Sequence, residues 1–228
     1  MALYCMQLQP RNGAVLRLSR NFYARGTLQV ARELVGMHLV HQDGNTRRVG
    51  RIVETEAYRG PTDLAAHSSR GRTPRSSVMY GPAGHAYVYL IYGVWNCLNV
   101  VTAAEGQPQA VLLRALAPIE NLDASSFGPG LLCRAMHIDR SLNAADLCGD
   151  KLWLERPGNH RPAPRIARSA RIGVEYAGLW ALRPWRFFDR DSPYVSTVTN
   201  SARNRAVTAS SRGGSRSEHP APPSAKMR

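Results

Sequence analysis

The sequence predicts an α+β fold, a single domain that combines an antiparallel sheet with surrounding helices. Two observations lead to this class. Segments rich in β-branched and aromatic residues come in pairs separated by short turn signals, which is typical of β-hairpins. The helical segments stand apart from these pairs and do not alternate with single strands, so a parallel α/β sheet is not favoured. With 228 residues, of which 43% are hydrophobic, the chain can bury one sizeable core.

The expected elements follow in chain order. Apolar residues recur at helical spacing over 27–35 and Gly36 follows them, which predicts a helix that ends there. Residues 37–58 indicate a hairpin with its turn at 43–45. The remaining segments are a second hairpin over 85–104 that turns near Tyr92-Gly93, a strand over 109–119, a short helix over 128–138, and alternating short strands and irregular structure in 150–157, 165–176 and 184–196.

We expect three parts along the chain: an N-terminal extension at 1–20 that is poorly ordered in part, a folded domain at 21–199, and a disordered basic tail at 200–228. The tail has almost no large apolar residues, so it cannot bury enough surface to offset the entropy of ordering. Its six Lys or Arg and one Glu contribute +5 to the net charge of +14, which leaves +9 on the rest of the chain. A body this basic favours a polyanionic partner, most often nucleic acid.

Several other classes of protein are disfavoured. No stretch approaches the ~18 consecutive apolar residues that a membrane-spanning helix needs, and no secretory signal is evident. No glycine-rich nucleotide-binding motif occurs, so we expect no nucleotide cofactor. The four cysteines form no Cys-x-x-Cys pair, which favours reduced thiols in a cytoplasmic protein over a zinc site.

The segment RIVETEAY carries two glutamates in a run that otherwise predicts a buried strand. Strict alternation places Ile52, Glu54, Glu56 and Tyr58 on one face. Carboxylates in apolar surroundings are costly unless they are paired, bind a metal or take part in chemistry. Three interpretations stay open: solvated or arginine-paired carboxylates, a metal site completed by His67, or a general base held in an aromatic pocket.

Aromatic side chains of the second predicted hairpin help to choose among these interpretations. Tyr87 and Tyr89 share a face, whereas Tyr92 falls on the opposite parity at the turn. An aromatic residue at a hairpin tip has no core to fill. In a basic protein it is a candidate wedge between base pairs, and the alternative is a side chain folded back over the turn. Tyr58, His67 and Tyr89 offer flat faces on which an extruded base can stack, so the combination favours a base-flipping enzyme.

A long ordered series of motifs runs from about Phe22 to Ser196. It comprises GRIVETEAYRGPTDLAAHSSRGRTPRSSVMYGPAGHAYVYLIYGVWNCLNVV, AVLLRALAPIE, GPGLLCRAMHID, LWLE, ARIGVEYAG and SPYVS. The series resembles the alkyladenine (3-methyladenine) DNA glycosylase family, of the Mpg type. This resemblance implies a curled antiparallel sheet with a protruding β-hairpin and surrounding helices, a fold similar to a formyltransferase C-terminal domain.

The resemblance also implies roles for individual residues. Glu56 matches the general base that activates water, and Arg114 matches an arginine near the catalytic water and the DNA backbone. Glu54 is expected to support the fold or the site by pairing with a basic residue. The other matched positions are Tyr58, His67 and Tyr89, which sandwich the flipped base; Asn99, which crowds the purine edge and disfavours undamaged guanine; Tyr92, the wedge; and Arg72, Thr73, Met79 and Ser192, which contact DNA.

The implied activity is that of a monofunctional DNA glycosylase of base excision repair, which removes alkylated or deaminated purines and leaves an abasic site. Glycosylases that also cut the strand usually form a Schiff base through an amine. The only lysines of the chain, Lys151 and Lys226, lie outside the motif-bearing hairpins. We therefore expect no lyase activity, and we expect neither a metal nor another cofactor.

The expected partner is double-stranded DNA that contains damaged purines, and we expect a monomer without membrane association. The protein would be cytoplasmic and nucleoid-associated in a bacterium, or nuclear in a eukaryote. Two alternatives stay open at this point. One is a non-catalytic nucleic-acid-binding module with the same fold, and the other is a metal-dependent hydrolase that uses Glu54, Glu56 and His67.

Overall fold

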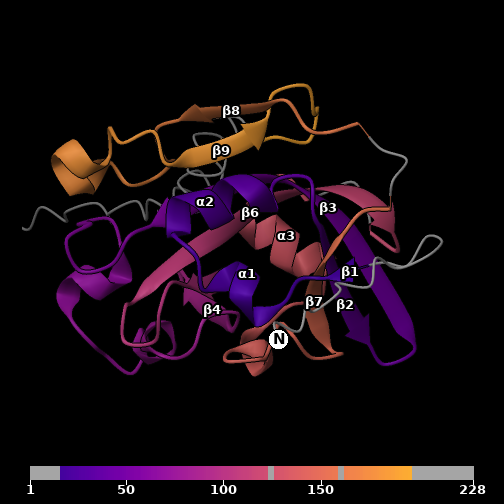
Figure 1. The fold of residues 1–228 in the computed structure, drawn as a ribbon, viewed down its shortest axis with the longest axis horizontal. Coiled ribbons are helices and arrows are strands. Elements are labelled where there is room, and N and C mark those ends of the chain that lie inside the picture. Colours follow the sequence, from indigo (N-terminus) through magenta and orange to yellow (C-terminus); the bar gives the residue numbers. More distant parts are fainter. Residues whose placement is uncertain (1–15, 123–125, 159–161, 197–228) are drawn as a thin grey trace, which may run out of the picture. The chain divides into compact units, whose positions relative to one another are not determined.

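An open antiparallel sheet forms the scaffold of the protein (Figure 1). The computed structural model describes residues 16–122, 126–158 and 162–196. Within these residues the sheet has nine strands: seven lie side by side in the order β1-β7-β2-β3-β6-β5-β4, and β9 pairs with both β3 and β8. The strands are β1 (Leu16–Arg17), β2 (His38–Asp43), β3 (Thr46–Tyr58), β4 (Ala86–Ile91), β5 (Trp95–Thr102), β6 (Gln109–Glu120), β7 (Leu152–Arg156), β8 (Ile166–Ser169) and β9 (Arg186–Asp189).

The predicted α+β class and both predicted hairpins are confirmed. β2 and β3 connect through a tight turn in which Gly44 has a φ of +56°, a region that glycine enters without steric cost. β4 and β5 pair as far as Ile91 and Trp95, and the short connection between these two residues places the exposed Tyr92 at the tip of the hairpin. Most of the predicted extension and all of the predicted tail lie outside the described residues. No helix in the described part of the chain is long and apolar enough to cross a membrane.

β3 is the longest strand and carries both glutamates. One edge of β3 pairs with β2 over residues 46–51 and then with β9 over residues 54–56, while the other edge pairs with β6. The glutamates therefore lie between two neighbouring strands, in the interior of the sheet. Both Glu54 and Glu56 are fully buried.

An irregularity in the pairing of β3 with β6 changes which residues share a face. Between Ile52 and Glu54 the register advances by two residues on β3 but by one on β6, so Val53 is an extra residue, as in a β-bulge. Ile52 consequently packs in the main core together with Ala57. The prediction that Ile52 shares a face with the glutamates is wrong, because strict alternation does not allow for a bulge.

The main core lies between the sheet and two helices, α2 (Thr27–Leu34) and α3 (Pro129–Ala135). α2 ends before Gly36 as predicted, and Gly36 adopts a φ of +97°. The hydroxyl of Thr55 donates to the carbonyl of Ala31 at 2.8 Å and so ties β3 to α2. Large buried side chains of this core are Leu34, Leu39, Ile52, Leu98, Leu113, Leu116, Leu132, Met136 and Leu147.

Several short elements were not predicted. α1 (Arg20–Tyr23) begins at the end of the predicted extension and is held because Phe22 and Tyr23 are buried. The 3₁₀ helices are η1 (His67–Arg70), η2 (Ser77–Tyr80), η3 (Arg140–Leu142) and η4 (Glu175–Trp180). β8 and β9 lie along α2, and the segment that connects these two strands contains η4 (Figure 1). This connection also carries Ile172, whose backbone N–H contacts Glu56.

Candidate active site

One face of the sheet collects most of the residues that the sequence predicts for the site. Glu56 on β3 is opposite Leu112 on β6, which is opposite Asn99 on β5, which is opposite Tyr87 on β4. Directly opposed residues of antiparallel strands point to the same face, so these four side chains form a row across the sheet. Tyr89 stands two positions along β4 from Tyr87 and therefore lies on this face too.

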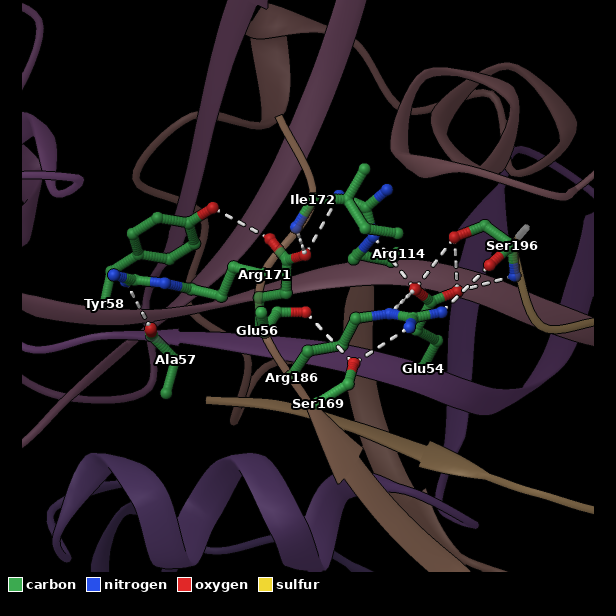
Figure 2. Close-up of polar contacts among 11 residues, drawn as sticks. Glu54, Glu56, Ala57, Tyr58, Arg114, Ser169, Arg171, Ile172, Arg186 and Ser196 are labelled. Atoms are coloured by element: carbon green, nitrogen blue, oxygen red, sulfur yellow. Dashed lines mark hydrogen bonds and ion pairs between the residues drawn. The ribbon is translucent and has the colours of Figure 1, made fainter. Parts of the chain in front are cut away.

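The carboxylate of Glu56 is held by three groups (Figure 2). The hydroxyl of Tyr58 donates to Oε2 at 2.8 Å, and the backbone N–H of Ile172 donates to Oε1 at 2.8 Å. The guanidinium of Arg114 lies 3.3 Å from Oε1. These contacts come from three separate parts of the chain, and they fix the orientation of a carboxylate that has no exposed surface.

Arg114 bridges the two glutamates. Its Nε donates to Oε1 of Glu54 at 3.0 Å, while its Nη1 faces Glu56. Arg114 stands at a second irregularity of the β3–β6 pairing, where Glu54 is opposite Ala115 and the next residue of β3 is opposite Leu113. Burial lowers the pKa of Arg114, but Glu56 and Glu54 favour its charged form and the net pKa is raised. Arg114 therefore remains a cation beside Glu56.

Glu54 is the centre of a buried ion-pair network that shares Arg114 with Glu56 (Figure 2). Besides Arg114, the Nε of Arg186 donates to Glu54 Oε1 at 2.6 Å, and the backbone N–H of Ser196 donates to Oε2 at 2.7 Å. The hydroxyl of Ser196 adds a further contact at 2.6 Å. The expected pairing of Glu54 with a basic residue is thus present with two arginines, and its carboxylate is occupied by structural partners.

Aromatic rings cover the sheet beside Glu56. His67 on η1 lies with its ring centroid 4.6 Å from that of Tyr89, at an interplanar angle of 73°, and its Nδ1 lies 2.8 Å from the hydroxyl of Tyr87. The guanidinium of Arg75 lies 4.8 Å from the centroid of the Tyr89 ring. The structure therefore brings His67 and Tyr89 together and places Tyr58 against Glu56 by its hydroxyl, although the three residues come from different elements.

The protonation states of this cluster follow from its burial. Burial, with the nearby cations Arg75 and Arg70, lowers the pKa of His67 to about 4, so its imidazole is neutral at neutral pH. Burial and the charge of Glu56 raise the pKa of Tyr58, which therefore keeps the proton that it donates. A neutral imidazole between aromatic rings does not repel a cationic ligand.

Asn99 and Tyr92 occupy contrasting positions. The side-chain amide of Asn99 is buried and donates to the carbonyl of Tyr87 at 3.2 Å, which fixes its position in the row beside Glu56. Tyr92 is 80% exposed at the tip of the β4–β5 hairpin and has a φ of +55°, an unfavourable backbone conformation for a bulky residue. Its side chain is thus presented to solvent and is not folded back over the turn.

The predicted DNA contacts differ in accessibility. Arg72 and Thr73 are exposed in the loop before η2, and Ser192 is half-buried in the turn after β9. Met79, in contrast, is 2% exposed and packs in a small cluster with Tyr87. The side chain of Met79 thus faces the interior, and a DNA contact at this position stays a prediction.

Sequence reasoning missed the side chains that hold the site from outside β3. These are Asp63, Arg171 and Arg186, together with the backbone N–H groups of Ile172 and Ser196. No local pattern distinguishes these arginines from the many others of the chain.

The metal-site alternative requires the side chains of Glu54, Glu56 and His67 to lie close enough together to bind one ion. Among the residues that the structure describes, no group of three or more His, Cys, Asp or Glu side chains is placed to hold a metal ion.

A basic protein with a buried, oriented carboxylate beside a cluster of aromatic residues fits the class of DNA glycosylases, enzymes that act on a base taken out of the helix. Comparison with known proteins makes the class specific. The model of the methylpurine-DNA glycosylase (MPG) family matches residues 21–193. The chain belongs to this family, and it is accordingly a DNA glycosylase, a hydrolase of DNA repair.

Bacterial relatives match most of the chain. A protein of Anaeromyxobacter sp. strain Fw109-5 is 55% identical over 182 residues, which cover 79% of this chain and 93% of the relative. A protein of Myxococcus xanthus strain DK1622 is 54% identical, with 78% and 93% covered, and one of Legionella pneumophila strain Corby is 52% identical, with 79% and 98% covered. Each bears the name "Putative 3-methyladenine DNA glycosylase".

Proposed function

We propose that this protein is a monofunctional glycosylase that flips alkylated or deaminated purines out of duplex DNA and hydrolyses the N-glycosidic bond with water activated by Glu56. The observation that carries this proposal is the carboxylate of Glu56, which is fully buried, oriented by Tyr58, Ile172 and Arg114, and placed on the same face as the aromatic residues. A module that only binds nucleic acid has no use for such a carboxylate.

The chemistry follows from these parts. An alkylated purine carries positive charge, which favours stacking on the electron-rich ring of Tyr89 and is not opposed by the neutral His67. As the base leaves with the electron pair of the glycosidic bond, the sugar gains oxocarbenium character that the nearby Glu56 carboxylate stabilises. Water attacks the anomeric carbon and gives a proton to Glu56.

We further propose that the product is an intact abasic site and that the protein acts as a monomer on double-stranded DNA, at the nucleoid if the cell is bacterial. Strand cleavage by a glycosylase usually requires an amine nucleophile. Lys151 precedes β7, a strand that pairs with β1 and β2 and not with the strands of the site. Lys226 belongs to the predicted tail.

An assay of base release tests the proposal. Duplexes that carry hypoxanthine or ethenoadenine should lose the damaged base, and the strand should break only after alkali treatment. Activity should survive EDTA, and borohydride should trap no covalent complex. Nicking without alkali together with a trapped complex would contradict the monofunctional mechanism, and loss of activity in EDTA would favour the metal-dependent alternative. Binding of the damaged duplex without base release would favour the non-catalytic module.

Replacing Tyr92 with alanine should weaken capture of the flipped nucleotide. A side chain that is 80% exposed at a hairpin tip adds little to the core, so the variant should fold as the wild type does. Loss of the stacked ring should reduce affinity for a duplex with a pyrrolidine abasic analogue about 10-fold or more. Titration by fluorescence anisotropy measures this, with Tyr92→Phe as the control that keeps the ring. Equal affinity of the alanine variant and the wild type would count against the wedge.

A further inference from the structure

The segment that follows β8 reaches the site through two consecutive residues. Ile172 donates its backbone N–H to Glu56, and the residue before it, Arg171, is buried against the same C-terminal end of β3. The Nη1 of Arg171 donates to the carbonyl of Ala57 at 3.0 Å, directly between Glu56 and Tyr58 (Figure 2). Its guanidinium also lies 4.8 Å from the centroid of the Tyr58 ring. Arg171 thus contacts the two residues that follow Glu56 in the sequence.

Asp63 connects Arg171 to the loop that carries His67. Arg171 donates to both carboxylate oxygens of Asp63, at 2.6 and 2.9 Å, and neither side chain of the pair is exposed. Asp63 in turn accepts the backbone N–H groups of Arg59 and Ala65, each at 3.1 Å. The turn between β3 and η1 is therefore built around this carboxylate, and His67 begins η1 two residues beyond Ala65.

A contribution to stability does not by itself explain the buried Arg171–Asp63 pair. A buried ion pair is often no more stabilising than well-packed apolar residues of similar volume, because both charges lose their hydration. Arg171 also leaves its buried Nε without a hydrogen-bond partner among the described residues. The pair instead fixes the geometry of its surroundings, because a planar guanidinium makes several contacts at fixed angles and an apolar side chain cannot.

We propose that Arg171 is a positioning residue for the reaction, which holds the Tyr58 ring and the Ile172 backbone so that both donate to Glu56, and which holds the His67 loop through Asp63. Arg171 does not touch the reacting atoms. The inference rests on the proposed role of Glu56 as the base. It assigns the connection between β8 and β9 a part in catalysis that is separate from DNA binding.

Two conservative variants, Arg171→Lys and Asp63→Asn, test the inference in the full-length protein. Lysine keeps the positive charge but cannot make the forked set of contacts, and asparagine keeps the shape but not the charge. The matched controls are Arg25→Lys and Glu33→Gln, because Arg25 and Glu33 also form a doubly hydrogen-bonded pair, at 3.3 and 2.7 Å, but a half-exposed one at α2. Thermal unfolding establishes the folded fraction of each variant at the assay temperature.

Single-turnover base release should fall about 10- to 100-fold in Arg171→Lys and Asp63→Asn, as expected when a supporting partner of a reactive group is removed. Affinity for the damaged duplex should stay within about threefold, because neither side chain is exposed to DNA. Both controls should match the wild type in rate and in affinity.

The pH–rate profile separates positioning from simple loss of fold. In Arg171→Lys and Asp63→Asn, displacement of Ile172 removes a hydrogen-bond donor to the carboxylate of Glu56. The acid limb of the pH–rate profile should therefore move to higher pH in these variants. Five titratable groups beside Glu56 do not titrate between pH 5 and 8. One is His67, because burial lowers its pKa to about 4. The pKa of Arg114, of Arg171 and of Tyr58 is raised, and burial raises the pKa of Cys97 to about 11.

Two results would overturn the inference: wild-type rates in both variants, or a reduced rate that equals the loss of folded protein while the acid limb stays in place. Failure of the proposed function is distinguishable from either result. If Glu56→Gln still releases the base, the role of Glu56 is wrong whatever the Arg171 variants do. If Glu56→Gln is inactive and Arg171→Lys turns over like the wild type, only the positioning role is wrong.

Discussion

Replacement of Glu56 by glutamine should reduce the rate of base release by about 10³-fold or more, while binding of damaged duplex DNA is kept. Glutamine has nearly the same shape: its oxygen can accept from the N–H of Ile172, and its amide N–H can donate to the hydroxyl of Tyr58. It cannot accept a proton from water at neutral pH, and it offers no negative charge to the developing oxocarbenium ion. Arg114 keeps its ion pair with Glu54, so the variant should remain folded.

The measurement is single-turnover base release from a hypoxanthine duplex with enzyme in excess, together with an affinity titration on the same duplex. Glu33→Gln is the matched control, because it makes the same chemical change at a half-exposed position of α2. Turnover of the Glu56 variant within about tenfold of the wild type would contradict its role as general base, which typically contributes 10²- to 10⁴-fold.

Replacement of Glu54 by glutamine should act on stability. Glu54 has no exposed surface and accepts contacts from Arg114, Arg186 and Ser196. Glutamine would turn an amide donor towards groups that are themselves donors, and it would leave two buried guanidinium groups without a full counter-charge. Breaking a buried ion pair in this way costs about 3–5 kcal/mol. Replacement of Glu54 should therefore lower stability, whereas replacement of Glu56, two positions away, should lower the rate of base release.

Urea unfolding followed by tryptophan fluorescence measures the free energy of unfolding, and a thermal melt should show a midpoint lower by roughly 6–20 °C for a domain of this size. Glu33→Gln serves again as the control, since a half-exposed ion pair contributes little. An unfolding free energy within about 1 kcal/mol of the wild type, the range expected for an exposed pair, would show that the Glu54 network is not a determinant of stability.

The elements that the sequence predicts well are those whose signals are local. The α2 helix and its end at Gly36, the two hairpins and the strand at β6 follow from periodicity and turn residues within about ten positions. The exposed tip at Tyr92 follows from the same kind of signal. An error arises where an irregularity breaks the period, as at Val53, and the burial of Met79 in a cluster with Tyr87 is not predicted from the sequence.

By itself, the sequence determined the antiparallel architecture, the basic character of the chain, and the candidate residues Glu56, Tyr58, His67 and Tyr89. Only the tertiary structure decided which contacts hold Glu56 and which hold Glu54. The partner of Glu56 at Ile172 is 116 positions away, and the partner of Glu54 at Ser196 is 142 positions away. Alternation along a strand tells which face a carboxylate shares, but contacts over such separations depend on how the strands pack, and those contacts leave one carboxylate oriented beside the aromatic residues and the other occupied by structural partners.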